Sequence, residues 1–473
     1  MSTTTIPRRA KVLVIGGGGR EHAIVDALSR SPRVEKIFCA PGNAGISLQA
    51  ECVHLEDTQV DELADFAESR GIDLTVVGPE VSLAAGIADE FTSRGLRIFG
   101  PSRAAARIES SKDFAKALMA KYDVPTAAYR TFSDYQEALE YVKSGSFPTV
   151  LKYDGLAAGK GVVVAENLEQ ADNALRDMLL DDRFGHGRVV VEEFLSGPEF
   201  SLLCFVNGTD VQPMVLAQDH KRAYDGDEGP NTGGMGAYTP LPFITEEDKA
   251  YALEHIMKPV AAAMVAEGTP FRGVLYGGLM KTADGIKVIE FNCRFGDPET
   301  EVVLPCLKSD IFEIFWAVAS DLPIPDAEWS DGAAIGFVLA SKGYPGKYAK
   351  GVEIKGLANA LADPSVKVYH MGTSLKKFQD GDLHEDFDGR GHSLVTAGGR
   401  VLMVLAQAST LAEAHAKALA AVEKVDCDNL FHRTDIGHWA LKEYETEQLL
   451  QHFIPSCKTL DTGNATTGSR DQF

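Results

Sequence analysis

The stretch Val12-Leu13-Val14-Ile15-Gly16-Gly17-Gly18-Gly19-Arg20-Glu21-His22 decides the first part of the fold. Four apolar residues stop at four glycines, and apolar residues then recur at helical spacing from Ala23 to Leu28. This order predicts a strand, a tight loop and a helix. Backbone amides of such a loop can bind a phosphate at the helix N-terminus. The alternative is a turn that serves only to pack the helix on the strand.

Similar units follow along the chain. Further strands are expected at Val34–Cys39, Leu74–Val77 and Arg97–Phe99, with a helix over Val60–Ala67. Each strand ends at a loop that contains glycine and proline. Alternating strands and helices predict a parallel sheet, and ligands of such sheets bind at the carboxyl ends of the strands. All four loops are therefore expected at one edge of the sheet.

The first glycine loop is a poor match to a dinucleotide-binding fingerprint. That fingerprint needs a glycine where this chain has Glu21, and an acidic residue after the second strand to hold a ribose. The second strand instead ends Phe38-Cys39-Ala40-Pro41. A dehydrogenase is therefore disfavoured, and a phosphate-bearing substrate is the better interpretation.

The composition of the chain argues against several classes of protein. The chain has 473 residues and a formal net charge of −22, which argues against a broad surface for nucleic acid or anionic membrane. Its 7 cysteines include no C-x-x-C pair, as is typical of a reducing compartment and not of a zinc framework. The N-terminus shows no secretory signal, and no run approaches the roughly 20 apolar residues of a membrane span. We expect a cytoplasmic protein.

The chain divides into three expected domains. An N-terminal α/β domain with a parallel sheet spans residues 1–110, and a second α/β region spans 111–330. A small α+β domain is expected over 331–445, and a polar tail, expected to be partly disordered, over 446–473. The fold class is thus multidomain α/β and α+β.

A second glycine-rich loop lies at Lys152-Tyr153-Asp154-Gly155-Leu156-Ala157-Ala158-Gly159-Lys160-Gly161. Its glycine spacing and its Gly161 do not match a P-loop, and it lies between two expected strands. Glycine amides flanked by Lys152 and Lys160 can still fold over a triphosphate. A flexible surface hairpin is the alternative.

The string Val288-Ile289-Glu290-Phe291-Asn292-Cys293-Arg294 predicts a metal site. On a strand, Glu290 and Asn292 point to one face while Ile289 and Phe291 point to the other. Two oxygen ligands beside substrate phosphates suit Mg²⁺, and Arg294 could hold a transferring phosphoryl group. A half-exposed edge strand is the alternative.

Two further segments carry candidate binding residues. The cluster at residues 218–222, with Asp219 and Lys221, lies close to the loop at 229–237 and could hold a small zwitterion or a sugar phosphate. The apolar strand at 189–193 leads into a hinge that could hydrogen-bond adenine, followed by the acid Glu199. Solvated loops and a solvated strand end are the alternatives.

Taken together, these strings resemble the phosphoribosylamine–glycine ligase family of ATP-grasp enzymes. The resemblance spans roughly Lys11 to Lys442 and includes the loops at Gly16–His22, Ala40–Gly45 and Val77–Glu80. Its most specific strings are Gly229–Tyr238 and Glu290–Thr300. It implies an N-terminal α/β domain, an ATP-grasp core whose clasp (about 125–195) moves, and a C-terminal α+β domain.

The resemblance also implies roles for individual residues. Glu290 and Asn292 would bind Mg²⁺ or Mn²⁺, and Arg294 would face the reacting groups. The implied ATP-binding residues are Lys112, Lys152, Gly159, Lys160, Gly161, Glu192, Phe194, Leu195 and Glu199. The implied substrate-binding residues are Gly19, Arg20, Asn43, Ala44, Gly45, Pro79, Glu80, Asp219, Lys221, Asn231, Thr232, Gly233, Gly234, Met235 and Gly236.

The family's reaction is the ATP-dependent joining of glycine to 5-phosphoribosylamine through a glycyl phosphate, in purine biosynthesis. We expect those small substrates, no nucleic acid and no membrane, and a monomer, with a dimer as the alternative. Departures from the family pattern are Ser110, Tyr153 and Ala223-Tyr224. An ATP-grasp ligase with another acid and amine, and a nonenzymatic nucleotide sensor, are the rival hypotheses.

Overall fold

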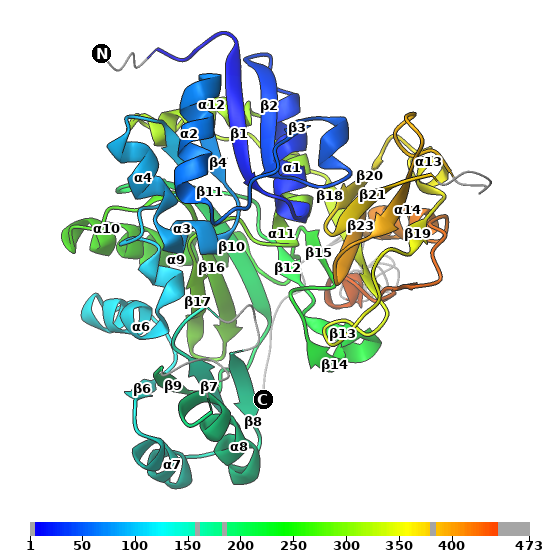
Figure 1. The fold of residues 1–473 in the computed structure, drawn as a ribbon. Coiled ribbons are helices and arrows are strands. Elements are labelled where there is room, and N and C mark those ends of the chain that lie inside the picture. The colour runs from blue at the N-terminus through cyan, green and yellow to red at the C-terminus, as the bar shows by residue number, and fades with distance from the viewer. Residues whose placement is uncertain (1–4, 157–160, 182–186, 379–384, 443–473) are drawn as a thin grey trace, which may run out of the picture.

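The computed structural model describes residues 5–156, 161–181, 187–378 and 385–442. Figure 1 shows three parts: a blue N-terminal layer above a green central sheet, a small cyan-to-green unit that projects below, and a yellow-to-orange unit to one side. The expected tail at 446–473 lies outside the described residues. Within the described residues, no helix is long and apolar enough to span a bilayer.

The N-terminal sheet is parallel, as predicted. Its strands run in the order β3-β2-β1-β4-β5. They are β1 (Ala10–Gly16), β2 (Val34–Pro41), β3 (Glu51–Cys52), β4 (Leu74–Val77) and β5 (Ile98–Phe99). The helices are α1 (Gly19–Ser29), α2 (Val60–Arg70), α3 (Glu80–Ala85) and α4 (Ile87–Ser93), with the 3₁₀ turn η1 (Ile46–Leu48). Helix α2 ends at Gly71, whose φ of +62° suits a glycine C-cap.

Two helices connect this layer to a central antiparallel sheet. They are α5 (Arg107–Ser110) and α6 (Lys112–Lys121), and α6 begins where the Ser111 hydroxyl accepts the Phe114 amide. The sheet has the order β11-β10-β16-β17. Its strands are β10 (Glu199–Asn207), β11 (Asp210–Pro213), β16 (Arg272–Thr282) and β17 (Gly285–Asn292). The helices α9 (Glu246–Ala252), η3 (Leu253–Met257), α10 (Lys258–Ala266) and α12 (Ile311–Ala319) pack around it. The short helices α11 (Glu299–Val303) and η4 (Leu304–Cys306) pack instead against α1 and β18.

The projecting unit has a hydrophobic core of its own. Its antiparallel sheet has the order β6-β9-β7-β8, and α7 and α8 pack against each other beside it. The elements are β6 (Tyr129–Phe132), α7 (Tyr135–Ser144), β7 (Thr149–Tyr153), β8 (Val162–Ala165), α8 (Leu168–Leu179) and β9 (Val189–Glu193). The two strands expected on either side of the second glycine loop are therefore confirmed as β7 and β8.

The third part shares its main sheet with the segment before residue 330. In the order β12-β15-β18-β23-β20, the first two strands come from 218–239 and the others from the C-terminal part. The strands are β12 (Gln218–Asp219), β15 (Gly236–Thr239), β18 (Ala333–Ser341), β20 (Val366–His370), β23 (Arg400–Ala408) and β24 (Leu430–Phe431). Helices α13 (Leu357–Ala360) and α14 (Leu411–Val422) and a second sheet of β19 (Glu353–Ile354), β21 (Thr373–Lys377) and β22 (His392–Thr396) complete it.

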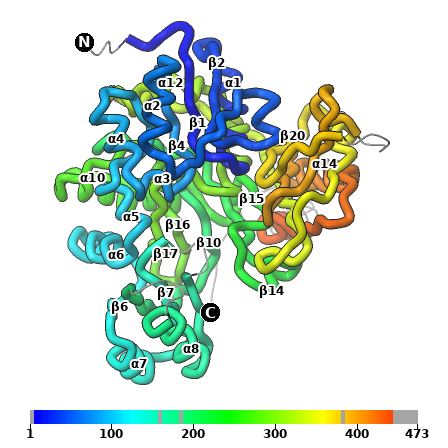
Figure 2. The backbone as a smooth tube through the Cα atoms, in the orientation of Figure 1, coloured from blue at the N-terminus to red at the C-terminus, as the bar shows by residue number. Residues whose placement is uncertain are grey.

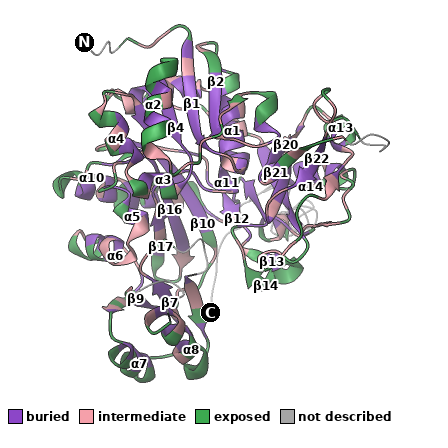
Figure 3. Ribbon diagram, viewed as in Figure 1, coloured by how far each residue is buried: buried purple, intermediate pink, exposed green. Residues whose placement is uncertain are grey.

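A hairpin lies beneath this third part. It consists of β13 (Arg222–Tyr224), the turn η2 (Asp225–Asp227) and β14 (Glu228–Asn231). The chain enters the hairpin from β12 and leaves it toward β15, and Figure 2 shows this green segment at β14 below the third part. Figure 3 shows that the strands inside the molecule are mostly buried, whereas β14 is exposed.

Helix α1 packs against β20, and two histidines meet at this contact. The His370 amide donates a hydrogen bond to His22 Nδ1 at 2.8 Å, and both side chains are buried. Burial, followed by the charge of Lys367, lowers the pKa of His22 to about 3. The unfolded chain binds a proton at His22 below about pH 6.5, but the folded chain does not. The stability that His22 contributes is thus complete above pH 6.5 and is lost as the pH falls toward 3.

We expect His22→Asn to remove this titration while its amide oxygen still accepts the His370 amide. Between pH 6 and 4, the free energy of unfolding of the unmodified protein should fall more steeply than that of the variant, by about 1.4 kcal/mol per pH unit. Denaturant unfolding at several pH values measures both slopes. Parallel curves would contradict this interpretation of the α1–β20 contact.

Candidate active site

A cavity of about 2120 Å³ lies where the three parts meet. Ligand pockets for one small molecule are commonly about 300–1,000 Å³, so this cavity has room for a nucleotide together with smaller substrates. Its walls come from the projecting unit, the central sheet, α6, the β13–β14 hairpin and the loop at 343–348.

The predicted metal ligands lie on the cavity wall near the end of β17. Glu290 and Asn292 are half-buried and line the cavity, while Phe291 between them is buried. Burial alone would raise the pKa of Glu290, but neighbouring cations lower it below its usual value. Those cations are Lys221, Lys152, Lys112 and Arg294. An ionised carboxylate beside an amide oxygen is a donor pair that fits a hard divalent cation.

A buried ion-pair cluster joins the projecting unit to α6. Glu192 Oε2 lies 3.0 Å from Lys116 Nζ and 3.1 Å from Lys152 Nζ. Lys152 also donates to the Ile289 carbonyl at 2.8 Å. Burial lowers the pKa of Lys116 to about 8, although Glu192 opposes this shift. Glu192 Oε1 has no hydrogen-bond partner among the described residues, so this carboxylate retains a free acceptor beside the cavity.

Lysine 112 ties α6 to the second glycine loop. Its Nζ donates to the Gly155 carbonyl at 3.3 Å, and the residue lines the cavity with Gly155 and Gly161. The ring of Tyr153 packs against Gly155, where a Cβ would lie 2.7 Å from the ring. Gly159 and Lys160 lie outside the described residues.

Glu80 is shared by two arginines from distant parts of the chain. Its Oε2 accepts Arg20 at 3.3 Å and Arg294 at 3.2 Å. Arg294 also pairs with Glu109 at 3.0 Å, and Glu109 accepts the Cys293 amide at 2.8 Å. Burial alone would raise the pKa of Glu80, but the two arginines lower it to about 2. The network connects the N-terminal sheet to the end of β17.

The first glycine loop and the Asn43 loop lie against each other, as their expected positions at one sheet edge imply. A Cβ at Gly17 would lie 2.5 Å from the Gly42 carbonyl oxygen. The Asn43 amide donates to the carbonyls of Gly17 at 2.9 Å and of His370 at 2.7 Å. These glycines therefore serve close packing, whatever else they bind.

Acidic side chains surround the N-terminus of α1. The Gly18 amide donates to Glu21 Oε2 at 2.6 Å, and a Cβ at Gly19 would collide with Glu301. Neither carboxylate oxygen of Glu301 has a hydrogen-bond partner among the described residues. Burial, and then the charge of Asp297, raises the pKa of Glu301 well above its usual value. Sugar-phosphate binding at Gly19 stays a prediction, and it would depend on Arg20 to offset these acids.

The Asn231 loop is divided between the cavity and the core. Asn231, Thr232 and Gly233 line the cavity, but Met235 is fully buried and does not. Gly236 begins β15 and pairs with Phe337, and a Cβ at Gly234 would collide with Pro298. Binding roles for all six residues of this loop stay predictions.

Two residues of the third part hold this loop. Arg400 donates to the carbonyls of Gly233 at 2.8 Å and Asp297 at 3.0 Å, and it pairs with the Asp297 carboxylate at 3.0 Å. The Tyr344 hydroxyl accepts the Gly233 amide at 3.1 Å. The loop's position is thus set by residues more than a hundred positions away along the chain.

The predicted adenine segment and the charged cluster lie on adjacent walls. Phe194, Leu195 and Glu199 line the cavity, and Phe194 is exposed. Glu199 Oε2 lies 3.4 Å from Lys221 Nζ. Burial raises the pKa of Asp219 to about 7, with Glu299 and Glu199 adding to the shift and Lys221 opposing it.

The remaining predicted residues divide between the cavity and its surroundings. Arg20 and Glu80 line the cavity. Gly19, Asn43, Ala44, Gly45 and Pro79 are not among its lining residues. A Cβ at Gly45 would collide with His370, so this loop packs on β20.

Sequence reasoning missed Lys116, Glu109, Arg400 and Tyr344, all of which line the cavity. Only Lys116 had a usable signal, because it follows Lys112 by four residues and lies on the same helix face. Together, these groups place an ionised carboxylate, several cations and glycine amides around one space. That arrangement can bind a polyphosphate with a divalent cation and stabilise charge on a group in transfer.

Comparisons with known proteins agree along the chain. Residues 10–109, 110–300 and 334–439 match the models of the phosphoribosylglycinamide synthetase N domain, ATP-grasp (A) domain and C domain. The phosphoribosylamine–glycine ligase of Halalkalibacterium halodurans is 51% identical over 434 residues, which cover 91% of this chain and 97% of the relative.

Solved structures agree as well. The phosphoribosylamine–glycine ligase of Thermotoga maritima has a TM-score of 0.76 at 31% identity, covering 90% of this chain and 100% of that one. The biotin carboxylase domain of Hydrogenobacter thermophilus 2-oxoglutarate carboxylase, solved with MgADP, has a TM-score of 0.65 at 15% identity. It covers 89% of this chain and 91% of that one, and it shows a shared fold.

We expect Glu80→Gln to destabilise the protein by about 2 kcal/mol, because Arg20 and Arg294 lose the charge that they share. Each arginine keeps one other carboxylate, Glu21 or Glu109, so the variant should still fold. The thermal unfolding midpoint measures the change.

Glu90→Gln is the matched control. Glu90 pairs with Arg94 at 2.6 Å where both side chains are partly exposed, and Arg94 keeps a second carboxylate, Asp65, at 2.6 Å. Losing such a solvent-accessible pair should cost about 0–1 kcal/mol. Equal midpoints for the two variants would show that the Glu80 network does not stabilise the fold.

Proposed function

Because the chain belongs to the phosphoribosylglycinamide synthetase family, we propose that it joins glycine to 5-phosphoribosylamine in an ATP-dependent reaction of purine biosynthesis. The products are glycinamide ribonucleotide, ADP and phosphate. The observation that supports this most directly is the environment of Glu290. Four neighbouring cations keep this carboxylate ionised, and Asn292 lies beside it. Both residues line a cavity large enough for three substrates.

The reaction has two group transfers. A carboxylate oxygen of glycine attacks the γ-phosphorus of ATP, and the bond to the ADP oxygen breaks, which gives glycyl phosphate. The amine nitrogen of phosphoribosylamine then attacks the acyl carbon, loses a proton and expels phosphate. No covalent bond to the enzyme is needed, so catalysis comes from alignment and from stabilisation of charge.

The nucleotide would lie between the projecting unit and the central sheet. We assign Lys112, Lys152 and the loop at 159–161 to its phosphates, and Glu192, Phe194 and Leu195 to adenine. Glu199 would take the ribose. Glu290 and Asn292 would hold Mg²⁺ or Mn²⁺, which offsets the negative charge of the nucleotide phosphates.

The acceptor substrates would meet the nucleotide at Arg294. Its guanidinium would stabilise charge on the phosphoryl group in transfer. Asp219, Lys221 and the loop at 231–236 would receive glycine and the amine, and the loops at Gly19, Asn43 and Pro79 the phosphorylated sugar. Arg294 forms ion pairs with Glu80 and Glu109, and it lines the cavity.

The proposal extends to the protein's location, its partners and its oligomeric state. We propose a cytoplasmic protein, which the 7 cysteines without a C-x-x-C pair support. The net charge of −22 supports action on small molecules and not on nucleic acid or membranes. The cations that it does carry near the motifs suffice for a local anion site. We propose a monomer.

We expect ADP formation to depend on both glycine and phosphoribosylamine, because the acyl phosphate is formed from one and consumed by the other. A coupled assay that follows ADP with each substrate omitted in turn tests this. ADP formation with other amino acids but not with glycine would refute the proposed substrate, and nucleotide binding without turnover would favour a sensor.

Glu290→Gln should lower the turnover number by about 10³-fold or more, because the proposed pair of metal ligands, Glu290 and Asn292, loses its carboxylate. Circular dichroism and the thermal midpoint should stay near those of the unmodified protein. Asp284→Asn is the matched control, since Asp284 is an exposed carboxylate in the turn at the far end of β17.

A metal chelator should abolish ADP formation by the unmodified protein, and added Mg²⁺ or Mn²⁺ should restore it. Near-normal turnover of Glu290→Gln, or activity that persists in chelator, would refute the metal assignment.

A further inference from the structure

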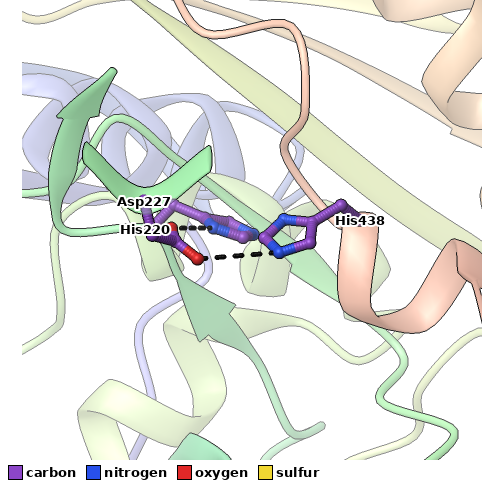
Figure 4. A group of neighbouring side chains, drawn as sticks. All are labelled: His220, Asp227 and His438. Carbon is purple, nitrogen blue, oxygen red and sulfur yellow. Dashed lines mark ion pairs between the residues drawn. The ribbon is translucent and has the colours of Figure 1, made fainter. Parts of the chain in front are cut away.

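Three side chains from two distant segments meet beside the cavity: His220, Asp227 and His438 (Figure 4). His220 Nδ1 lies 3.6 Å from Asp227 Oδ1, and His438 Nε2 lies 3.6 Å from Asp227 Oδ2. The ligand atoms are near enough to one another to suggest a metal site. Other contacts of the same residues point to a different role.

The hydrogen bonds of His220 leave it no free lone pair for a metal. The Gly437 amide donates to His220 Nε2 at 2.9 Å, so the neutral ring carries its proton on Nδ1. That proton points to Asp227. A metal ligand must offer a lone pair, so metal binding would require His220 to lose its last ring proton. The Arg433 guanidinium, 2.9 Å from Asp227 Oδ1, would also repel a cation.

Arg433 is the buried centre of this network. Its side chain is fully buried, and it forms two hydrogen bonds to Asp435, at 2.7 and 2.9 Å. A third donor atom contacts Asp227 and donates to the Arg222 carbonyl at 3.1 Å. One guanidinium therefore connects the C-terminal segment to the start and the turn of the β13–β14 hairpin.

The hairpin has little apolar packing to hold it. All four residues of β14 are exposed, no residue of η2 is buried, and Ala223 is the one buried residue of β13. Polar contacts to the C-terminal segment take the place of a core. The Asp225 carboxylate accepts the amide and hydroxyl of Thr434 at 2.8 and 2.7 Å.

Residues of the proposed site stand at the two ends of this hairpin. Lys221 directly precedes β13. Asn231 is the last residue of β14, and Thr232 follows it. The Thr232 amide donates to the Lys221 carbonyl at 2.7 Å, which joins the two ends. All three residues line the cavity, so a shift of the hairpin would move them together.

We propose that Asp227 is a positioning residue, which links His220, Arg433 and His438 so that the hairpin holds Lys221, Asn231 and Thr232 in place for the acceptor substrates. This inference rests on the proposed function. The backbone of Asp227 supports it, because its φ of +56° is a left-handed conformation that few residues other than glycine, asparagine and aspartate adopt readily. The residue holds this conformation while its carboxylate contacts all three partners.

Asp227→Asn tests the proposal, because asparagine tolerates the same backbone conformation but lacks the charge. We expect kcat/KM for glycine and phosphoribosylamine to fall about 10- to 100-fold through misplacement of the reacting groups. The Kd for ADP should change far less, because the assigned nucleotide residues lie outside the hairpin and only Glu199 contacts a displaced residue, Lys221. Amide hydrogen exchange over residues 222–231 should become faster in the folded protein.

Glu228→Gln is the matched control. Glu228 is an exposed carboxylate next to Asp227 in the same hairpin and does not line the cavity. Its kinetics and exchange should equal those of the unmodified protein. If Asp227→Asn lowers the thermal midpoint but leaves both kcat/KM values and the exchange unchanged, the network is merely structural and the proposal is wrong.

Zn²⁺ titration distinguishes the proposed positioning role of Asp227 from a metal site. The unmodified protein and Asp227→Asn should bind the same number of zinc ions, and a site lost in the variant would overturn the proposal. Failure of the proposed function is distinguishable, since the unmodified protein itself would then lack glycine-dependent ADP formation. The exchange and zinc measurements do not depend on that activity.

Discussion

Glu80 is the carboxylate on which the arrangement of the site depends. Two arginines that follow strands of different sheets share its charge: Arg20, in α1 after β1, and Arg294, after β17. An unpaired cation at this depth would be costly, since the desolvation of a charge is repaid only by a well-placed partner. This shared charge allows loops of the N-terminal sheet and of the central sheet to lie side by side at one cavity.

The same requirement for balanced charge recurs around the cavity. Glu192 holds two lysines, Asp297 holds Arg400, and Arg433 holds two aspartates. Glu290 differs, because neighbouring cations lower its pKa although it forms no ion pair within 4 Å among the described residues. A carboxylate left ionised but not closely paired is suited to a ligand that arrives later, such as a divalent cation.

The third part of the chain belongs to the site and not only to the scaffold. Its sheet is completed by β12 and β15, which flank the hairpin that carries the candidate acceptor residues. Arg400 and Tyr344 hold the Asn231 loop from the same side. A domain boundary near residue 330 therefore separates β12 and β15 from the strands with which they form one sheet.

The local parts of this fold could be predicted from the sequence. A run such as Val12–Ile15, or the alternation around Phe291, depends on neighbouring residues, and the structure confirms the strands and the parallel sheet. The strand ends brought Arg20 and Glu80 to the cavity, because parallel strands bring their carboxyl ends to one edge, but the loops at Asn43 and Pro79 lie outside its lining. Tertiary structure alone decided which cation meets which acid, that Met235 turns into the core, and that Arg433 holds a hairpin two hundred residues earlier. Those outcomes depend on packing between segments that are distant in sequence, where leaving a buried charge unpaired costs much free energy. The spacing of residues along the chain therefore does not predict them.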